Sequence, residues 1–162
     1  MHTHQVSVRR ATEADLPRIA EFLRHMLADM AAVGGHPVAT DSGYWTKVEA
    51  EFQDHLQTPD CLHLLAEVAD TQPSKVGWAF ARSTEREPVF ESARLLHISA
   101  LYVSPAHRRR GIGRTLLDAI LDWGRSIGCT EAELNVLIDN PARSLYRDLG
   151  FNAFEIEMTR KL

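Results

Sequence analysis

The chain has 162 residues, 44% hydrophobic and 25% charged, a composition typical of one globular domain spanning 1–162. Its formal net charge of −4 argues against broad binding to nucleic acid or to an anionic membrane, because both need a basic surface. The start Met1–Gln5 has no apolar leader pattern and no run of about eighteen apolar residues occurs, so we expect a cytoplasmic protein.

Cysteine and histidine positions do not suggest a metal site. The two cysteines, Cys61 and Cys129, lack C-x-x-C spacing and stand among apolar residues, which indicates reduced core thiols rather than a disulfide. The eight histidines form no H-E-x-x-H or other dense set of ligands. We therefore expect a protein without a metal cofactor.

Apolar spacing in the first half of the chain predicts a strand, two helices and a hairpin of two strands. The first helical period begins at Leu16, where Thr12 or Asp15 can cap the helix and Pro17 falls in the first turn. The predicted elements are a strand over 6–8, a helix from 16 to a stop at 34–35, a helix over 45–56 that Pro59 ends, and antiparallel strands over 62–68 and 76–80 joined by the turn formers 70–74.

The second half of the chain predicts a strand, a long helix and a strand, which is the pattern of a βαβ unit. Asn140 is a good N-cap for a further short helix, with Pro141 in its first turn and Gly150 just past its end. The predicted elements are a strand over 93–103, a helix over 111–127, a strand over 131–138, the short helix after Asn140, and a last strand in which Phe154, Ile156 and Met158 alternate with polar residues.

A basic loop joins the strand that ends at Leu101–Val103 to the helix that begins at Gly111. Free backbone N–H groups at a helix start, with the positive end of the helix dipole behind them, favour an anion. Gly111 and Gly113 let a phosphate approach the backbone, and three consecutive arginines add positive charge. The segment therefore predicts a phosphate cradle; a solvated basic loop is the plainer interpretation, in a chain with fifteen arginines and three lysines.

The kind of phosphate ligand stays open from the residues alone. The spacing is not that of a P-loop, and Gly111-x-Gly113 lacks the third glycine of a dinucleotide fingerprint because Leu116 stands there. Glu131 and Glu133 follow about twenty residues later, where an acid would bind a ribose, so a dinucleotide such as NAD is an alternative. The single βαβ unit is half of what a dinucleotide crevice requires.

Two motifs resemble those of the GNAT superfamily of N-acetyltransferases. The segment Arg108–Gly113 resembles the pyrophosphate motif [QR]-x-x-G-x-[GA], and L-Y-V-x-P at 101–105 precedes it as in that family. The segment Asn140–Phe151 resembles the signature N-x-x-A-x-x-L-Y-x-x-x-G-F but is one residue shorter between its asparagine and its tyrosine, with Arg143 where alanine is usual and Ala142 one place earlier. The resemblance covers the chain from its first strand onward and is sharpest over 95–151.

The resemblance and the order of elements imply a mixed α/β domain with four helices and a central, mostly antiparallel sheet of six or seven strands. The strands through Val103 and Val136 would run parallel and splay apart at the cofactor. The implied cofactor is acetyl-CoA, as acetyl donor. The residues implied to bind it are Leu101, Tyr102, Val103, Arg108, Arg109, Arg110, Gly111, Ile112, Gly113, Arg114 and Asn140.

The family resemblance also implies direct transfer of the acetyl group to an amine in a ternary complex. An amide N–H near Val103 would stabilise the oxyanion, and Tyr146, which matches the motif tyrosine, would protonate the departing thiolate. A thiol of pKa about 8.5 needs little help, so this assistance is modest. Core packing beside Leu145 and Leu149 is the structural alternative for Tyr146.

The residue that accepts the proton of the amine departs from the family pattern. Many members have a glutamate four residues before the valine of L-Y-V, where this chain has Ser99. His97 shares strand parity with Ser99 and is the best titrating neighbour, with Glu67 or Glu91 as alternatives through a water. A lone histidine in a strand is more often structural, so a packing role for His97 stays open.

In this family the junction of the first two helices covers the acceptor site. Asp29, His36 and Tyr44 are expected to meet the acceptor there, whereas Met26 and Met30 fall on the apolar stripe of the first helix. The expected acceptor is the amine of a small molecule or a peptide. A protein N-terminal or lysine acetyltransferase and a non-catalytic CoA-binding sensor are the alternatives, and a homodimer is left open.

Overall fold

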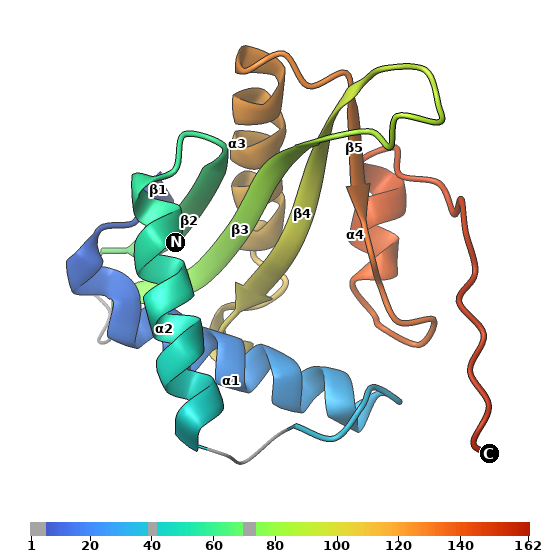
Figure 1. Cartoon of the computed structure of the whole chain (residues 1–162). Coiled ribbons are helices and arrows are strands. Elements are labelled where there is room, and N and C mark those ends of the chain that lie inside the picture. The colour runs from blue at the N-terminus through green and yellow to red at the C-terminus, as the bar shows by residue number, and fades with distance from the viewer. Residues whose placement is uncertain (1–5, 39–41, 70–73) are drawn as a thin grey trace.

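The computed structural model describes residues 6–38, 42–69 and 74–162. Within these residues five strands form one sheet, and helices cover both of its faces (Figure 1). The strands are β1 (Val6–Arg10), β2 (Cys61–Val68), β3 (Lys75–Glu85), β4 (Arg94–Val103) and β5 (Glu131–Leu134). The helices are α1 (Leu16–Ala32), α2 (Ser42–Gln57), α3 (Ile112–Ser126) and α4 (Arg143–Asp148), with the short 3-10 helices η1 (Glu13–Asp15) and η2 (Pro105–His107).

Strand pairing confirms a mostly antiparallel sheet with one parallel pair. The strands β1 to β4 pair antiparallel in succession, and β4 pairs parallel with β5 from Leu95–Glu131 to Ile98–Leu134. The last pair is parallel because α3 lies between the two strands in sequence and returns the chain to the same end of the sheet. This mixed sheet excludes the dinucleotide alternative, which needs parallel strands with helices between them.

The expected six or seven strands are too many, since the described residues form five. The last strand, predicted around Ile156, is an extended segment without strand pairing. Period-2 spacing predicts an extended chain but does not say which strand lies beside it. The strand predicted over 131–138 is also shorter than expected, because β5 ends at Leu134 and does not reach Val136.

The helix boundaries agree closely with the apolar spacing. Gly34, with φ 95°, follows α1 at the predicted stop. The helix α4 begins at Arg143, two residues later than Pro141, because a hydrogen-bonded turn closed by Arg143 N–H and Asn140 C=O precedes it. The turn predicted over 70–74 lies outside the described residues except for Ser74.

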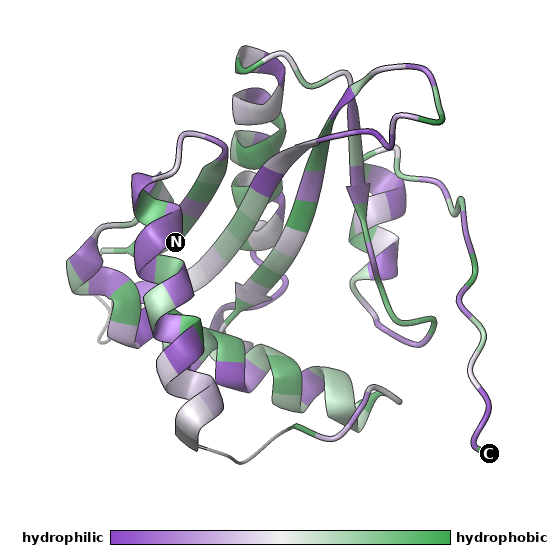
Figure 2. Ribbon diagram, viewed as in Figure 1, coloured by the Kyte–Doolittle hydropathy of each residue, from purple (hydrophilic) through white to green (hydrophobic). Residues whose placement is uncertain are grey.

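Two apolar clusters, one on each face of the sheet, make up the core. The helix α3 turns Ile112, Leu116 and Ile120 toward one face, as its sequence period predicts. The helices α1 and α2 cover the other face, where Phe22 and Phe52 share a cluster with the buried Trp78. Figure 2 shows hydrophobic residues concentrated along the central strands and α3. The sheet is therefore covered on both faces, and its ends and edges are left for a ligand.

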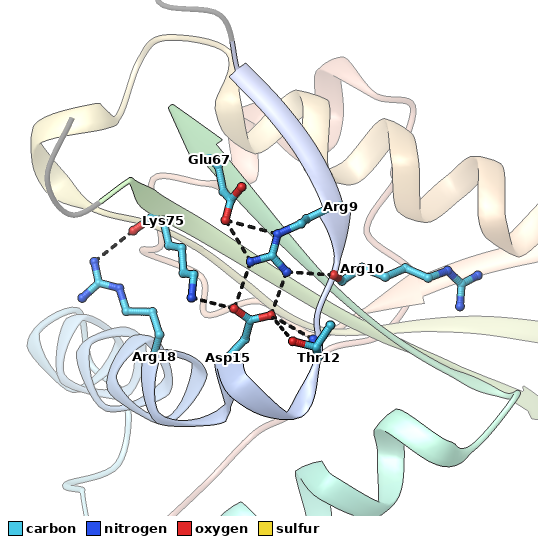
Figure 3. A network of polar contacts seen from close by, with 7 residues as sticks. All are labelled: Arg9, Arg10, Thr12, Asp15, Arg18, Glu67 and Lys75. Atoms are coloured by element: carbon cyan, nitrogen blue, oxygen red, sulfur yellow. Dashed lines mark hydrogen bonds and ion pairs between the residues drawn. The ribbon is translucent and has the colours of Figure 1, made fainter. Parts of the chain in front are cut away.

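A polar network ties the start of the chain to the sheet (Figure 3). Asp15, whose side chain is 3% exposed, accepts hydrogen bonds from Arg9 Nη1 at 2.7 Å and Nη2 at 2.9 Å, and Lys75 Nζ lies 2.7 Å from its Oδ1. Arg9 also donates to Glu67 Oε1 at 2.8 Å. The hydrogen bonds from Arg9, then those from Lys75 and Thr12, hold the pKa of Asp15 well below its usual range. One buried carboxylate thus joins β1, β3 and the start of α1.

Both cysteines are free thiols, each half-buried beside a different apolar cluster. Burial raises the pKa of the Cys61 thiol and of the Cys129 thiol, so neither is activated as a nucleophile. Among the described helices, none is both long enough and apolar enough to cross a membrane.

Candidate active site

The strands β4 and β5 separate beyond Ile98. Their parallel pairing ends at Ile98–Leu134, whereas β4 continues to Val103 and stays paired with β3. In the part of the chain that the structure describes, residues 99–103 therefore have a neighbouring strand on one side only. Backbone groups on the other side lack a strand partner, so an extended ligand can pair with them. The expected parallel pair is thus confirmed, whereas the gap beyond it arises because β5 ends at Leu134, before Val136.

A β-bulge at Ser99 lies where the two strands separate. The ladder between β3 and β4 pairs Ile98 and Ala100 but skips Ser99. Ile98 packs in the cluster under α3, whereas Ala100 packs in the cluster under α1 and α2, so the side-chain alternation changes face at Ser99. Strand parity therefore does not carry from His97 to Ser99, because that argument assumes a regular strand.

The loop between β4 and α3 has the backbone of a tight turn. Arg109 has φ 62° and Gly111 has φ 81°, both in the left-handed region that favours glycine. Gly111 is the N-cap of α3 and has no side chain to bond the first N–H groups of that helix. These N–H groups, with the helix dipole behind them, make a local positive site suited to an anion.

Four arginines surround this turn. Arg108 Nη2 lies 2.6 Å from Asp29 Oδ2 of α1, and Arg108 Nε donates to the carbonyl of Val103 at 2.8 Å. The other three arginines are exposed and form no ion pair within residues 6–38, 42–69 and 74–162. Their unneutralised charge makes the loop positive in a chain whose net charge is −4. These three are Arg109, Arg110 and Arg114.

The start of α3, the end of β4 and α4 meet at Gly113. A Cβ added at Gly113 would lie 3.3 Å from Leu145 Cδ2 of α4 and 3.9 Å from Val103 Cγ2 of β4. The lack of a side chain lets these elements pack closely. Glycine is favoured at position 111 for another reason. A Cβ there would meet no atom within 4 Å, but the backbone has a positive φ that other residues rarely adopt. The segments Arg108–Gly113 and Asn140–Phe151, which carry the two family-like motifs, are therefore neighbours in space although they are distant in sequence.

The remaining residues predicted to bind the cofactor offer mainly their backbone. Leu101 and Val103 pack toward the α3 cluster, and Ile112 is buried in it. Tyr102 faces the opposite cluster, with its ring centroid 5.4 Å from that of Phe22, and burial raises its pKa. These side chains pack into the core and fix the position of β4 and of the start of α3. A ligand beside residues 99–103 would therefore contact the backbone N–H and C=O groups of β4.

Tyr146 lies on α4 beside the same junction. Its ring is half-buried against the α3 cluster and stands edge-on to Phe151, with 6.1 Å between ring centroids. Burial raises the pKa of Tyr146 to about 12, so the hydroxyl keeps its proton at physiological pH and can donate it. The hydroxyl bonds to none of the described residues. Packing of the ring and donation by the hydroxyl are therefore compatible.

Asn140 was predicted as the N-cap of the short helix, but Ala142 is the N-cap of α4, and Asn140 instead closes the turn before the helix. Its Oδ1 accepts the N–H of Ala142 at 2.9 Å, and its carbonyl accepts the N–H of Arg143 at 3.1 Å. Arg143 Nη1 in turn donates to the carbonyl of Ile138 at 2.6 Å, which closes the loop before the helix. This turn leaves the side-chain Nδ2 of Asn140 without a hydrogen-bond partner among the described residues, so Nδ2 is available to a ligand.

His97 pairs with Glu133 across β4 and β5. The two residues stand at the same register position, and His97 Nδ1 lies 3.2 Å from Glu133 Oε1. Since Leu96 and Ile98 face α3, His97 lies on the opposite face of the sheet. The carboxylate orients the ring and leaves Nε2 for another partner. Sequence reasoning missed Glu133 in this role, because the register of two strands cannot be read from either pattern alone.

The two carboxylates weighed as bases through a water lie elsewhere. Glu67, on β2, forms an ion pair with Arg9 of β1 (Figure 3). The strand β3 lies between β2 and β4 in the sheet. Glu91 precedes β4, at the end of that strand opposite to Val103. Neither adjoins the gap between β4 and β5. The described residues also contain no group of three or more metal-ligating side chains able to hold an ion.

The three residues expected at the acceptor differ in their surroundings. Asp29 reaches the arginine loop through its contact with Arg108. His36 is exposed in the loop after α1, and Tyr44, in the first turn of α2, stands edge-on to Trp45 at 5.2 Å. No hydrogen bond, ion pair or ring contact joins the three side chains to one another within the described ranges. Of these residues, the structure brings Asp29 alone beside the cofactor motif.

Comparisons with known proteins agree with this geometry. The sequence profile of the Acetyltransferase (GNAT) family matches residues 23–151. An aminoglycoside N(6')-acetyltransferase type 1 from Acinetobacter genomosp. 13 is 29% identical over 112 residues, which cover 65% of this chain and 72% of that protein. An N-alpha-acetyltransferase RimI from Mycobacterium tuberculosis is 32% identical over 150 residues, 92% of this chain and 80% of that protein. The solved aminoglycoside N-acetyltransferase AAC(6')-Iy in complex with CoA shares the fold, with a TM-score of 0.76 at 18% identity over 99% of this chain and 97% of the other.

Proposed function

We propose, since the chain belongs to the acetyltransferase (GNAT) family and is an acetyl-CoA-dependent N-acetyltransferase, that it transfers the acetyl group directly to a primary amine of a small molecule or peptide. Both substrates are bound at once in this proposal. The observation that carries it is the unpaired edge of β4 at 99–103, directly before the arginine loop and the uncapped start of α3.

The loop Arg108–Arg114 holds the pyrophosphate of the cofactor through backbone N–H groups and arginine side chains. The glycines at 111 and 113 keep Cβ atoms out of the way. The edge of β4 at Leu101–Val103 pairs with the extended arm of the cofactor, and Asn140 contacts that arm from the start of α4. What supports this assignment is the free charge of the loop and the meeting of β4, α3 and α4 at Gly113.

The transfer requires two proton movements by residues of this chain. The amine nitrogen bonds to the acetyl carbon and gives a proton to His97 Nε2, directly or through a water that Ser99 positions, while Glu133 stabilises the imidazolium. A backbone N–H near Val103 stabilises negative charge on the acetyl oxygen. As the carbon–sulfur bond breaks, Tyr146 gives its hydroxyl proton to the sulfur.

Release of CoA thiol in the presence of amines tests the proposed transfer. The protein is mixed with acetyl-CoA and, separately, with an aminoglycoside, a polyamine, an amino acid and a peptide with a free N-terminus. We expect thiol release to require protein and at least one of these amines. Binding of acetyl-CoA without thiol release from any of them would instead support the cofactor-binding sensor.

Acetyl-CoA is expected to protect the fold, by about 2.7 kcal/mol when its free concentration is a hundred times the dissociation constant. Gly111→Val should abolish this protection, because a β-branched residue cannot keep φ 81° and the loop would rearrange. The matched control is Gly128→Val, since Gly128 has φ 85°, equally open surroundings, and a position past the far end of α3. Differential scanning fluorimetry measures both; protection by NAD but not by acetyl-CoA would contradict the site.

A protein N-terminus is the second candidate acceptor. The identity of 32% to an N-alpha-acetyltransferase over 92% of this chain favours it. The peptide in the amine panel separates the two candidates, because a protein-directed enzyme would prefer the peptide to the aminoglycoside by its kcat/KM ratio.

Asp29→Asn is expected to raise the KM of a cationic acceptor about tenfold without raising that of acetyl-CoA. Asp29 is bonded to Arg108 here, and engagement of Arg108 by the pyrophosphate would free its carboxylate for an ammonium group. Steady-state kinetics with each substrate varied in turn give both KM values. The control is Asp118→Asn, on the exposed outer side of α3. An unchanged acceptor KM in Asp29→Asn would remove Asp29 from the acceptor site.

A further inference from the structure

The end of β4 turns one side chain toward α1. Leu101 and Val103 pack under α3, so Tyr102 between them faces the other side of the sheet. Its ring centroid lies 6.0 Å from that of His25, with 42° between the two ring planes. Figure 1 shows α1 passing the end of β4, beyond the last residue that pairs with β5. His25 therefore stands beside the part of β4 to which the proposed function assigns the acetyl group.

His25 is exposed and free to take a proton. Among the residues that the structure describes, none forms a hydrogen bond or an ion pair with its ring nitrogens. Imidazole is the side chain that gains and loses a proton around neutral pH. Tyr102 differs, because burial, and then the charge of Asp29, raises the pKa of its hydroxyl. Of these two neighbouring rings, His25 is the one that can accept a proton from a ligand near neutral pH.

A carboxylate lies one turn after His25 on the same side of α1, at Asp29. Its Oδ2 is 2.6 Å from Arg108 Nη2, and the same guanidinium lies over the Tyr102 ring, 5.6 Å from the centroid. A cation is thus held between a carboxylate and an aromatic ring in this structure. Arg108 belongs to the loop proposed to hold the pyrophosphate, so a bound cofactor would draw it away and leave this place to the ammonium group of the acceptor.

The charge on the preceding turn of α1 is already compensated. Glu21 stands four residues before His25 and forms an ion pair with Arg18 at 2.6 Å. Once Arg108 turns to the pyrophosphate, Asp29 is the neighbouring carboxylate without a cation of this chain. Its negative charge then favours both an ammonium group beside it and a protonated ring at His25.

We propose, on the basis of the acetyl transfer proposed above, that His25 is a second proton acceptor of the reaction and removes the proton with which the acceptor amine arrives. A primary amine is mostly an ammonium ion near neutral pH and has no lone pair for attack. One N–H bond breaks, the proton goes to a ring nitrogen of His25, and the freed lone pair attacks the acetyl carbon. His25 then passes this proton to solvent. The proton that His97 takes during attack balances the one that Tyr146 gives to the sulfur, so one proton is released per turnover.

The pH dependence of kcat/KM for the acceptor tests this role, with whichever amine of the panel the wild type acetylates fastest. His25→Gln should lower kcat/KM at least about tenfold at pH 7. The deficit should shrink as the pH approaches the pKa of the amine, which is about 10 for an alkylamine. There the amine arrives uncharged and needs no residue to take that proton. The KM of acetyl-CoA should stay unchanged.

The matched control is Arg24→Gln, at the neighbouring position of α1. The guanidinium of Arg24 lies over the Trp45 ring of α2, 4.5 Å from its centroid, so this variant disturbs the contact between α1 and α2 but removes no proton acceptor. Any loss of kcat/KM in the control should be the same at every pH.

Two kinds of result would overturn the role of His25. A loss in His25→Gln that is constant with pH, or no loss at all, would overturn it and leave the acetyl transfer standing. A wild type that releases no thiol with any amine would overturn the acetyl transfer, and the role of His25 with it.

Discussion

Tyr146→Phe is expected to lower kcat by roughly ten- to a hundredfold and to leave the affinity for acetyl-CoA nearly unchanged. The substitution removes the hydroxyl proton but keeps the ring that packs beside Phe151 on the α3 cluster. Because burial raises the pKa of Tyr146 to about 12, the wild-type hydroxyl is protonated throughout the working pH range. Steady-state kinetics for kcat and thermal shifts for acetyl-CoA binding measure the two quantities separately.

The residues around the β4 bulge provide the comparison for Tyr146. Ser99→Ala should have a smaller effect, because a serine cannot act as a base near neutral pH and at most positions a water. His97→Gln should remove or move the acidic limb of the pH–rate profile if His97 accepts the proton, whereas a structural His97 would change stability and leave the limb in place. Full activity of Tyr146→Phe at every pH would take Tyr146 out of the mechanism.

Asp15→Asn is expected to destabilise the fold by about 3 kcal/mol near neutral pH, because it leaves Arg9 and Lys75 facing each other without their shared carboxylate. For a chain of this size the loss corresponds to a fall in melting temperature of about 6–12 °C. The matched control is Asp122→Asn, which breaks the exposed pair between Asp122 and Arg125 and should change stability by less than about 1 kcal/mol.

The effect of Asp15→Asn should depend on pH. The pKa of Asp15 is depressed in the folded chain, chiefly by the hydrogen bonds from Arg9, whereas an unfolded aspartate titrates near pH 3.9. The ionised group therefore contributes its full stability above about pH 5, and this contribution is lost as the pH falls through and below 3.9. Urea unfolding of both chains at several pH values should show their difference shrinking in acid. A constant difference would mean that Asp15 acts by packing alone.

Local patterns were enough to predict the helices and the turn between β4 and α3. The stop at Gly34, the turn that Asn140 closes before α4 and the buried face of α3 depend on neighbours within a few residues, so spacing and turn chemistry reveal them. The glycine turn before the start of α3 was predictable for the same reason, since it is a local feature.

Register and long-range contacts were decided by the tertiary structure alone. The bulge at Ser99, the partner of His97 on β5 and the burial of Asp15 each depend on which residues of distant segments stand opposite one another. The alternation within one strand is the same whatever its register or its neighbour. It could therefore not show that β5 ends at Leu134 or that the segment after α4 pairs with no strand of the described residues.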